Sequence, residues 1–169
     1  MSTSLRSHLL AVVLAALAAL LLASTAPGGA YGQIVRGERW ADTDGDAPEP
    51  KGLRAARKAV SAVGVPYRWG GESPESGFDC SGLVRWAYLH VGVELPHSSY
   101  ALYELGRRVS ASRLEPGDLL FFEGLGHVGL YLGRGRMVHA PQTGRHVEVV
   151  RLGGSGYGGR LIGARRVAA

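Results

Sequence analysis

The spacing of the apolar residues changes near residue 115, and this change limits the folds that the chain can adopt. Before residue 105, apolar residues recur every three or four positions, as they do on one face of an α-helix. After residue 118, short apolar runs alternate with glycine-bearing turns, which is typical of β-strands. Helices followed by strands predict an α+β domain with an antiparallel sheet.

Three helices and five strands follow from these patterns. The helices are expected at residues 53–63, 80–90 and 99–105, and the strands at residues 119–122, 127–132, 136–140, 146–152 and 161–167. Asp79 stands directly before the second helix and is predicted to be its N-cap.

The N-terminal segment does not fit this domain. A weakly basic start, an apolar run over residues 9–23 and small residues up to Ala30 follow the order of a secretory signal peptide. We therefore predict a signal peptide over residues 1–32. The apolar run is shorter than the roughly 20 residues needed to cross a bilayer, so we expect no stable membrane span after cleavage. An uncleaved anchor is the alternative.

Residues 33–50 are expected to form a flexible tether, because this acidic, proline-bearing stretch has no apolar periodicity. The folded domain then comprises residues 51–169, without internal repeats. The formal charge is +5, and the basic residues are scattered without interleaved aromatic residues. We therefore expect no binding of nucleic acid, and we expect a monomer.

Cys80 is the only cysteine of the chain. Exported proteins that use cysteine structurally normally pair it in disulfides, so a single thiol is either reactive or buried and inert. At the first turn of a helix, free N–H groups and the helix dipole lower the pKa of a thiol. The adjacent Asp79 opposes this effect, so a catalytic Cys80 needs a histidine as well.

His127 and His139 are the candidates for that histidine, because each lies in an apolar strand where an unpaired imidazole is costly. If the hairpin between them has an odd number of loop residues, centred on Gly133 or Arg134, both side chains point to one face. A two-residue turn would instead place them on opposite faces. In the favourable case His127 accepts the thiol proton and His139 orients His127.

Two other interpretations remain open from the local pattern. A lone cysteine at the start of an apolar helix is often a small buried hydrophobic residue. Cys80 and the two histidines could also ligate zinc, although no closely spaced ligand pair accompanies them.

Five segments, in order, resemble the NlpC-type (NlpC/p-sixty) family of bacterial cell-wall peptidases over residues 53–167. They are Tyr67-Arg68-Trp69-Gly70-Gly71, Phe78-Asp79-Cys80-Ser81-Gly82-Leu83-Val84, Leu114-Glu115-Pro116-Gly117-Asp118-Leu119, His127-Val128-Gly129-Leu130-Tyr131-Leu132-Gly133 and Met137-Val138-His139-Ala140. The resemblance implies a papain-like fold, in which N-terminal helices, with the nucleophile at a helix N-terminus, pack on a five- to six-stranded antiparallel sheet.

The resemblance also implies roles for individual residues. Cys80 is the nucleophile, His127 the base and His139 the third polar residue, while Tyr67 faces the thiol and helps to bind the oxyanion. Asp79 and Ser81 match positions that hold substrate in some members, although an N-cap role is favoured for Asp79. No metal and no organic cofactor are implied. Trp69 is expected to be a packed indole, and His97 stands where the family often has arginine.

The function implied by the resemblance is hydrolysis of peptidoglycan stem peptides, at the bond between D-γ-glutamate and the following diamino acid, through a thioester. With the signal peptide, this places the protein in the cell wall, periplasm or extracellular space of a bacterium. The alternatives are an amidase or acyltransferase of the same fold acting on another substrate, and a non-catalytic wall-binding domain.

Overall fold

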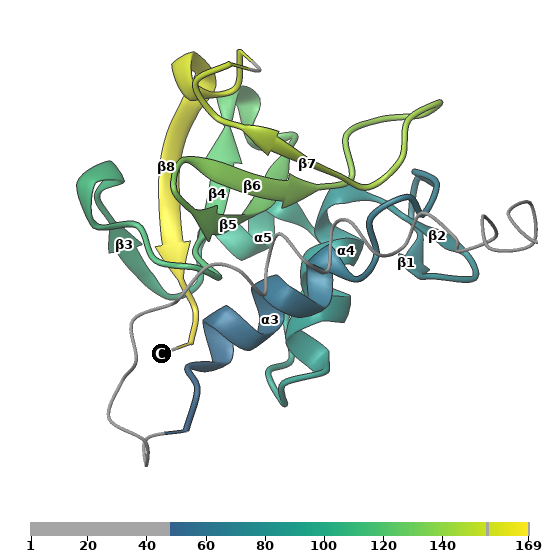
Figure 1. Cartoon of the computed structure of the whole chain (residues 1–169), viewed down its shortest axis with the longest axis horizontal. Helices are drawn as coiled ribbons and strands as arrows, with labels where there is room; N and C mark the ends of the chain where they lie inside the picture. The colour runs from purple at the N-terminus through teal and green to yellow at the C-terminus, as the bar shows by residue number, and fades with distance from the viewer. Residues whose placement is uncertain (1–47, 155, 169) are drawn as a thin grey trace, which may run out of the picture.

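The computed structural model describes residues 48–154 and 156–168. The predicted signal peptide and residues 33–47 of the predicted tether lie outside these residues. In the described part of the chain, no helix is long and apolar enough to cross a membrane. Three α-helices come before most of the strands (Figure 1): α3 (Lys51–Val60), α4 (Cys80–Leu89) and α5 (Ser99–Tyr103).

The main sheet is antiparallel throughout and has the strand order β3-β8-β4-β5-β6-β7. Its strands are β3 (Arg107–Val109), β4 (Leu119–Phe122), β5 (Val128–Gly133), β6 (Arg136–His139), β7 (Glu148–Arg151) and β8 (Leu161–Arg166). A small hairpin precedes α4 and consists of two strands of two residues each, β1 (Glu72–Ser73) and β2 (Gly77–Phe78). Short 3-10 turns cover Ala111–Arg113, Glu123–Leu125 and Gly158–Arg160. The predicted α+β class and papain-like arrangement are confirmed.

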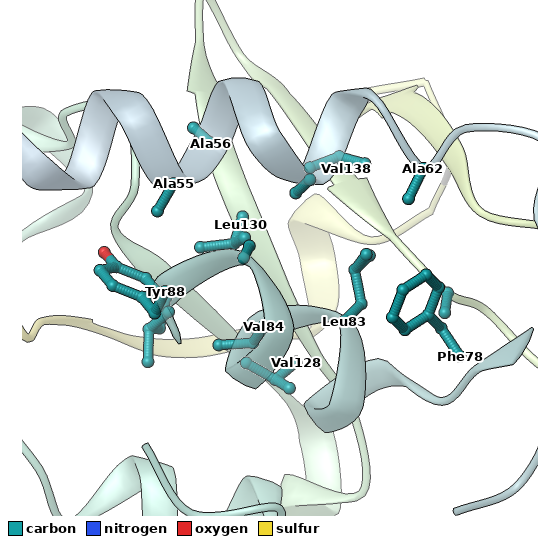
Figure 2. Close-up of a cluster of buried hydrophobic side chains, with 14 of the residues drawn as sticks. Ala55, Ala56, Ala62, Phe78, Leu83, Val84, Tyr88, Val128, Leu130 and Val138 are labelled. Atoms are coloured by element: carbon teal, nitrogen blue, oxygen red, sulfur yellow. The ribbon is translucent and has the colours of Figure 1, made fainter. Parts of the chain in front are cut away.

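Helices α3 and α4 pack against each other and against the sheet at β5. Figure 2 shows small side chains of α3, among them Ala55 and Ala56, facing Leu83 and Val84 of α4 and Leu130 of β5. All five side chains are almost completely buried. Alanine on the buried face of α3 lets the two helix backbones approach closely, so that the first turn of α4 is held firmly over the sheet.

In strand β4, four consecutive apolar residues alternate between the two faces of the sheet. Leu119 and Phe121 belong to the main core under the helices, whereas Leu120 and Phe122 belong to a smaller cluster on the opposite face. Successive side chains of a strand point to opposite faces, so both faces of the sheet are covered here. The cover on the second face includes Tyr157, from the segment between β7 and β8.

A buried ion pair joins the start of β4 to β8. Both oxygens of the Asp118 carboxylate accept hydrogen bonds from Arg166, at 2.7 Å from Nε and 2.8 Å from Nη2. Asp118 also accepts the backbone N–H of Glu115, at 2.8 Å. The bidentate geometry satisfies two buried charges at once and fixes the turn that leads into β4.

Candidate active site

Cys80 is the first residue of α4, and Asp79 caps this helix. The backbone of Asp79 is extended, and its Oδ1 accepts the N–H of Gly82 at 2.7 Å. The cap therefore places the Cys80 side chain at the end of the helix where the N–H groups are free.

Opposing effects act on the Cys80 thiol. Burial raises its pKa most, and the nearby Asp79 carboxylate raises it further. The backbone N–H groups of Val128, Ser81 and Cys80 itself are directed at the sulfur and oppose this rise. The thiol itself donates to the carbonyl oxygen of Gly126, with the sulfur 4.0 Å from that oxygen. The net result is a raised pKa, so the resting residue is a protonated thiol that contacts the peptide segment around His127.

The two predicted histidines meet on one face of the sheet. His127 directly precedes β5, and His139 ends β6. Because Leu130 pairs with Val138, His139 lies opposite Gly129, two residues beyond His127. Nε2 of His127 and Nδ1 of His139 are hydrogen-bonded at 2.8 Å. The structure thus brings together the two imidazoles that the sequence placed in separate strands.

The turn between these strands differs from the expected one. It is a two-residue loop, Arg134-Gly135, with positive φ at both residues, as in a type I′ turn. Such a turn alone would have put the histidines on opposite faces. A register shift between Tyr131 and Gly133 compensates, since it restores the pairing that is centred on Arg134. The expectation about two-residue turns was wrong because it ignored this bulge.

Both imidazoles are held in the neutral form. Burial lowers the pKa of His127 to about 3, and the neighbouring His139 and Arg160 add to this effect. Burial and the charge of Arg145 lower the pKa of His139 to about 4. At neutral pH the site therefore holds a neutral thiol and two neutral imidazoles. A neutral imidazole can accept a proton, which is what a general base requires.

Glu148 is a neighbour of this pair that the sequence analysis missed. It lies on β7 directly opposite His139, and its Oε1 is 3.6 Å from the fully buried Nε2 of His139. Nη2 of Arg145 lies 2.8 Å from both oxygens of this carboxylate. The carboxylate is therefore fixed where it favours a proton on Nε2 of His139. Only the strand register reveals this contact, because Glu148 looks like an ordinary exposed-face residue in the sequence.

Tyr157 is the second residue that was missed, because its glycine-rich surroundings indicated only a connection. Its ring centroid lies 5.7 Å from that of His127 and 4.9 Å from that of His139. It also packs against Phe122, with a centroid distance of 5.0 Å. Tyr157 therefore packs on both imidazoles and contributes to their desolvation.

Tyr67 is close enough to Cys80 for their charges to interact. Burial raises the pKa of its phenol, and the charges of Cys80 and Asp79 raise it further. Its backbone N–H is bonded to the carbonyl of Arg145 at 2.8 Å, which fixes this segment beside the loop that follows β6. Tyr67 is therefore protonated at neutral pH and can donate a hydrogen bond near the sulfur.

Both carboxylate oxygens of Asp79 accept hydrogen bonds from other groups of the protein. Besides the cap bond, its Oδ1 accepts the Ser81 hydroxyl at 3.1 Å and lies 2.9 Å from Nε2 of His97. Its Oδ2 accepts the N–H of Gly70 at 2.9 Å. Ser81 is buried in the same network. These contacts favour a structural role for Asp79, which ties the loop before α4 to the helix.

Trp69 does not pack as expected. Its side chain is 88% exposed, beside the loop that Asp79 holds. The reason is local, since Gly70 has a positive φ and the chain turns away from the core there. In the described residues, no group of three His, Cys, Asp or Glu side chains lies close enough to hold a metal ion.

Several known proteins are similar in sequence to this chain. A probable endopeptidase of Mycobacterium tuberculosis is 47% identical over 114 residues, which cover 64% of this chain and 29% of the relative. The murein DD-endopeptidase MepH of Escherichia coli is 40% identical over 121 residues, which cover 67% of this chain and 45% of MepH. The chain thus spans less than half of the length of these relatives.

The crystal structure of an NlpC/P60 family protein from Bacillus cereus superposes with a TM-score of 0.67 at 34% identity, covering 72% of this chain and 42% of that one. The sequence model of the NlpC/P60 family matches residues 64–166 of this chain. This range includes Cys80, His127 and His139. This chain therefore belongs to the NlpC/P60 family.

Proposed function

We propose that the protein is a cysteine peptidase that hydrolyses peptidoglycan stem peptides. One observation carries this proposal: a thiol at a helix N-terminus lies against the segment that bears His127, and His127 is hydrogen-bonded to His139. A structural cysteine would not require the buried imidazole of His139 and the half-buried imidazole of His127 at this segment, since each costs desolvation energy.

The geometry supports a two-step acyl transfer. The sulfur of Cys80 attacks the carbonyl carbon while His127 takes the thiol proton, which forms the S–C bond. His127 then gives this proton to the leaving amine as the C–N bond breaks, and a thioester remains. Water, deprotonated by His127, attacks the thioester and releases the acid and the thiol. The Tyr67 hydroxyl and the Cys80 N–H stabilise the oxyanion in both steps.

The tautomers follow from this role. To accept a proton on Nδ1, His127 must carry a hydrogen on Nε2 and donate it to Nδ1 of His139. His139 then carries its own hydrogen on Nε2, next to Glu148. The opposite arrangement would leave His127 protonated on Nδ1 and unable to act as a base.

The substrate class comes from the relatives. MepH is named as a murein endopeptidase, and other matching proteins from mycobacteria are named peptidoglycan endopeptidases. We propose the bond between D-γ-glutamate and the following diamino acid as the scissile bond. The name of MepH favours a second candidate, the crosslink bond between a D-alanine and a D-centre of the next stem.

Such a substrate lies outside the cytoplasm, so the proposal includes export by the N-terminal segment and action in the cell wall or periplasm. The basic character of the chain, with a formal charge of +5, favours association with anionic wall polymers.

The decisive experiment is incubation of the purified protein with defined monomeric and crosslinked muropeptides, followed by mass analysis. Cleavage after D-glutamate supports the first bond, and separation of crosslinked dimers supports the second. Cys80→Ala must abolish either product. Release of whole peptides from the glycan would indicate an amidase instead. Binding of peptidoglycan by the unaltered protein without any cleavage would indicate a wall-binding domain.

A further inference from the structure

A hollow of about 440 Å³ opens beside His127. Its wall is formed by the backbone of Gly126, the side chains of His127 and Phe122, and residues of two later segments: Gln142, Tyr157 and Arg160. The carbonyl of Gly126 is also the group that contacts the Cys80 sulfur. The hollow therefore begins at the segment that contacts the thiol.

The chemistry of acyl transfer determines which part of a substrate reaches this hollow. The sulfur binds the carbonyl carbon, and His127 must protonate the amine that leaves. The leaving nitrogen therefore lies next to His127. The residue that bears this nitrogen extends from His127, and the hollow is the space that His127 itself lines.

Arg160 supplies the positive charge of this hollow. Among the described residues its hydrogen bond is from Nε to the carbonyl of Gly156, at 3.3 Å. Its guanidinium lies over the Tyr157 ring, 5.0 Å from the centroid. This stacking holds the planar group in place without using its terminal nitrogens, which is the arrangement that suits recognition of a carboxylate. The charge also acts at His127, whose pKa it lowers.

We propose that this hollow binds the residue that supplies the leaving amine, and that Arg160 pairs with a carboxylate of that residue. The inference rests on the proposed function. It names what the proposed function leaves open: the diamino acid that supplies the leaving amine carries a free carboxylate, as diaminopimelate does on its side chain, whereas a lysine residue within a longer stem carries none. A bound carboxylate also removes the unfavourable effect of the Arg160 charge on protonation of His127 in the transition state.

The carboxylate can come from two sources. It is either the side-chain carboxylate of a diaminopimelate residue or the free C-terminal carboxylate of a stem that ends at the diamino acid. Four substrates distinguish the two sources. Three are stems extended by D-alanine: one with diaminopimelate, one with diaminopimelate amidated on its side-chain carboxyl, and one with lysine. The fourth is a lysine stem that ends at the lysine. Amidation removes the charge and nearly conserves the size.

The experiment compares kcat/KM for these substrates in the wild-type protein and in Arg160→Ala, Arg160→Lys and Arg54→Ala. Arg54 is an exposed arginine of α3 that does not line the hollow, so it serves as the matched control. We expect the wild-type protein to prefer a substrate with a free carboxylate by about tenfold, the effect of one charge-assisted hydrogen bond. Arg160→Ala should remove this preference, Arg160→Lys should keep part of it, and Arg54→Ala should leave it unchanged.

The outcomes distinguish failure of the carboxylate site from failure of the proposed function. If the wild-type protein cleaves none of these stems, the proposed D-γ-glutamyl bond fails, and this inference fails with it, while separation of crosslinked dimers would leave the peptidase function standing. If it cleaves charged and amidated substrates equally, or if Arg160→Ala lowers kcat/KM for all of them by one factor, the carboxylate site is overturned while the peptidase function stands. The comparison of substrates in the wild-type protein needs no variant, so it remains decisive even if Arg160→Ala does not fold.

Discussion

Nε2 of His127 and Nδ1 of His139 lie 2.8 Å apart, and this hydrogen bond fixes which nitrogen of His127 can accept a proton. The bond joins residues twelve positions apart whose strands pair with a register shift between Tyr131 and Gly133. Without that shift the imidazoles would lie on opposite faces of the sheet. A backbone irregularity in one hairpin therefore determines the proposed catalytic geometry.

Replacement of His139 tests this arrangement. His139→Asn keeps an oxygen that can accept the hydrogen of His127 Nε2, whereas His139→Ala leaves that hydrogen unpaired and the ring free to rotate. We expect His139→Ala to lower kcat by about 10²-fold, within the range for general-base catalysis, and His139→Asn to lower it clearly less. KM should change little in both. Steady-state kinetics on one muropeptide checks this, and equal losses in the two variants would contradict the orienting role.

Glu148 should control the tautomer of His139. Loss of its carboxylate in Glu148→Ala removes the negative charge that lies 3.6 Å from Nε2 and favours a proton there, so we expect a several-fold lower kcat. Glu148→Gln removes the charge but keeps an oxygen near Nε2, so it should recover only part of the activity. Nitrogen chemical shifts of the two imidazoles report the tautomers directly, and Glu94→Ala serves as an exposed control. An unchanged His139 tautomer in Glu148→Ala would contradict this role of Glu148.

Tyr67→Phe should lower kcat without affecting folding. The phenyl ring keeps the packing of the tyrosine, but the hydroxyl near Cys80 is lost. Removal of one oxyanion donor costs about 10²-fold in kcat in enzymes of this kind of chemistry, and we expect a loss of that order. The control is the thermal unfolding curve, which should not shift. A kcat equal to that of the unaltered protein would mean that backbone N–H groups alone stabilise the oxyanion.

The sequence predicts the elements that have strong internal patterns. Helix α4 begins at Cys80 as expected, because Asp79 is an unambiguous N-cap and four apolar side chains, Leu83, Val84, Ala87 and Tyr88, recur on one face. The strands β4 and β5 also lie where their apolar runs predict them. In each case the local pattern and the tertiary environment agree.

Strand β3 was missed for a physical reason. Its residues Arg107 and Arg108 are exposed and carry no apolar alternation, and the strand exists only because it pairs with β8 at the edge of the sheet. The same reason hides Glu148 and Tyr157, whose contacts with the histidines arise from strand register and from a glycine-rich connection. Long-range pairing of this kind leaves no periodic signal in the sequence.

Asp118 should be a major contributor to stability. Its carboxylate is 1% exposed and bound twice by Arg166, so Asp118→Ala leaves a buried guanidinium without its main partner. We expect the free energy of unfolding to fall by about 3–5 kcal/mol, measured by urea denaturation. In the double variant Asp118→Leu/Arg166→Met the unpaired charge is absent, so part of that loss should be recovered. A double variant less stable than Asp118→Ala would contradict this account.

The buried histidines should make the protein acid-sensitive. The folded-state pKa of His139 is about 4 and that of an unfolded histidine is about 6.5, so the unfolded chain binds more protons between these values. Stability must then rise with pH and be lost as the pH falls from about 6.5 towards 4. For His139, which is 0% exposed, the loss by pH 4 is on the order of 3 kcal/mol.

His139→Asn isolates this contribution, since asparagine does not titrate. The free energy of unfolding, measured by urea denaturation at several pH values between 7 and 4, should fall less steeply in His139→Asn than in the wild-type protein. His90→Asn, at an exposed position on the end of α4, is the matched control and should keep the wild-type slope. Parallel curves for the wild-type protein and His139→Asn would mean that His139 binds its proton equally well in the folded and unfolded states. In that case burial would not set the protonation state of His139, and its imidazole would acquire a proton near pH 6.5, as an exposed histidine does.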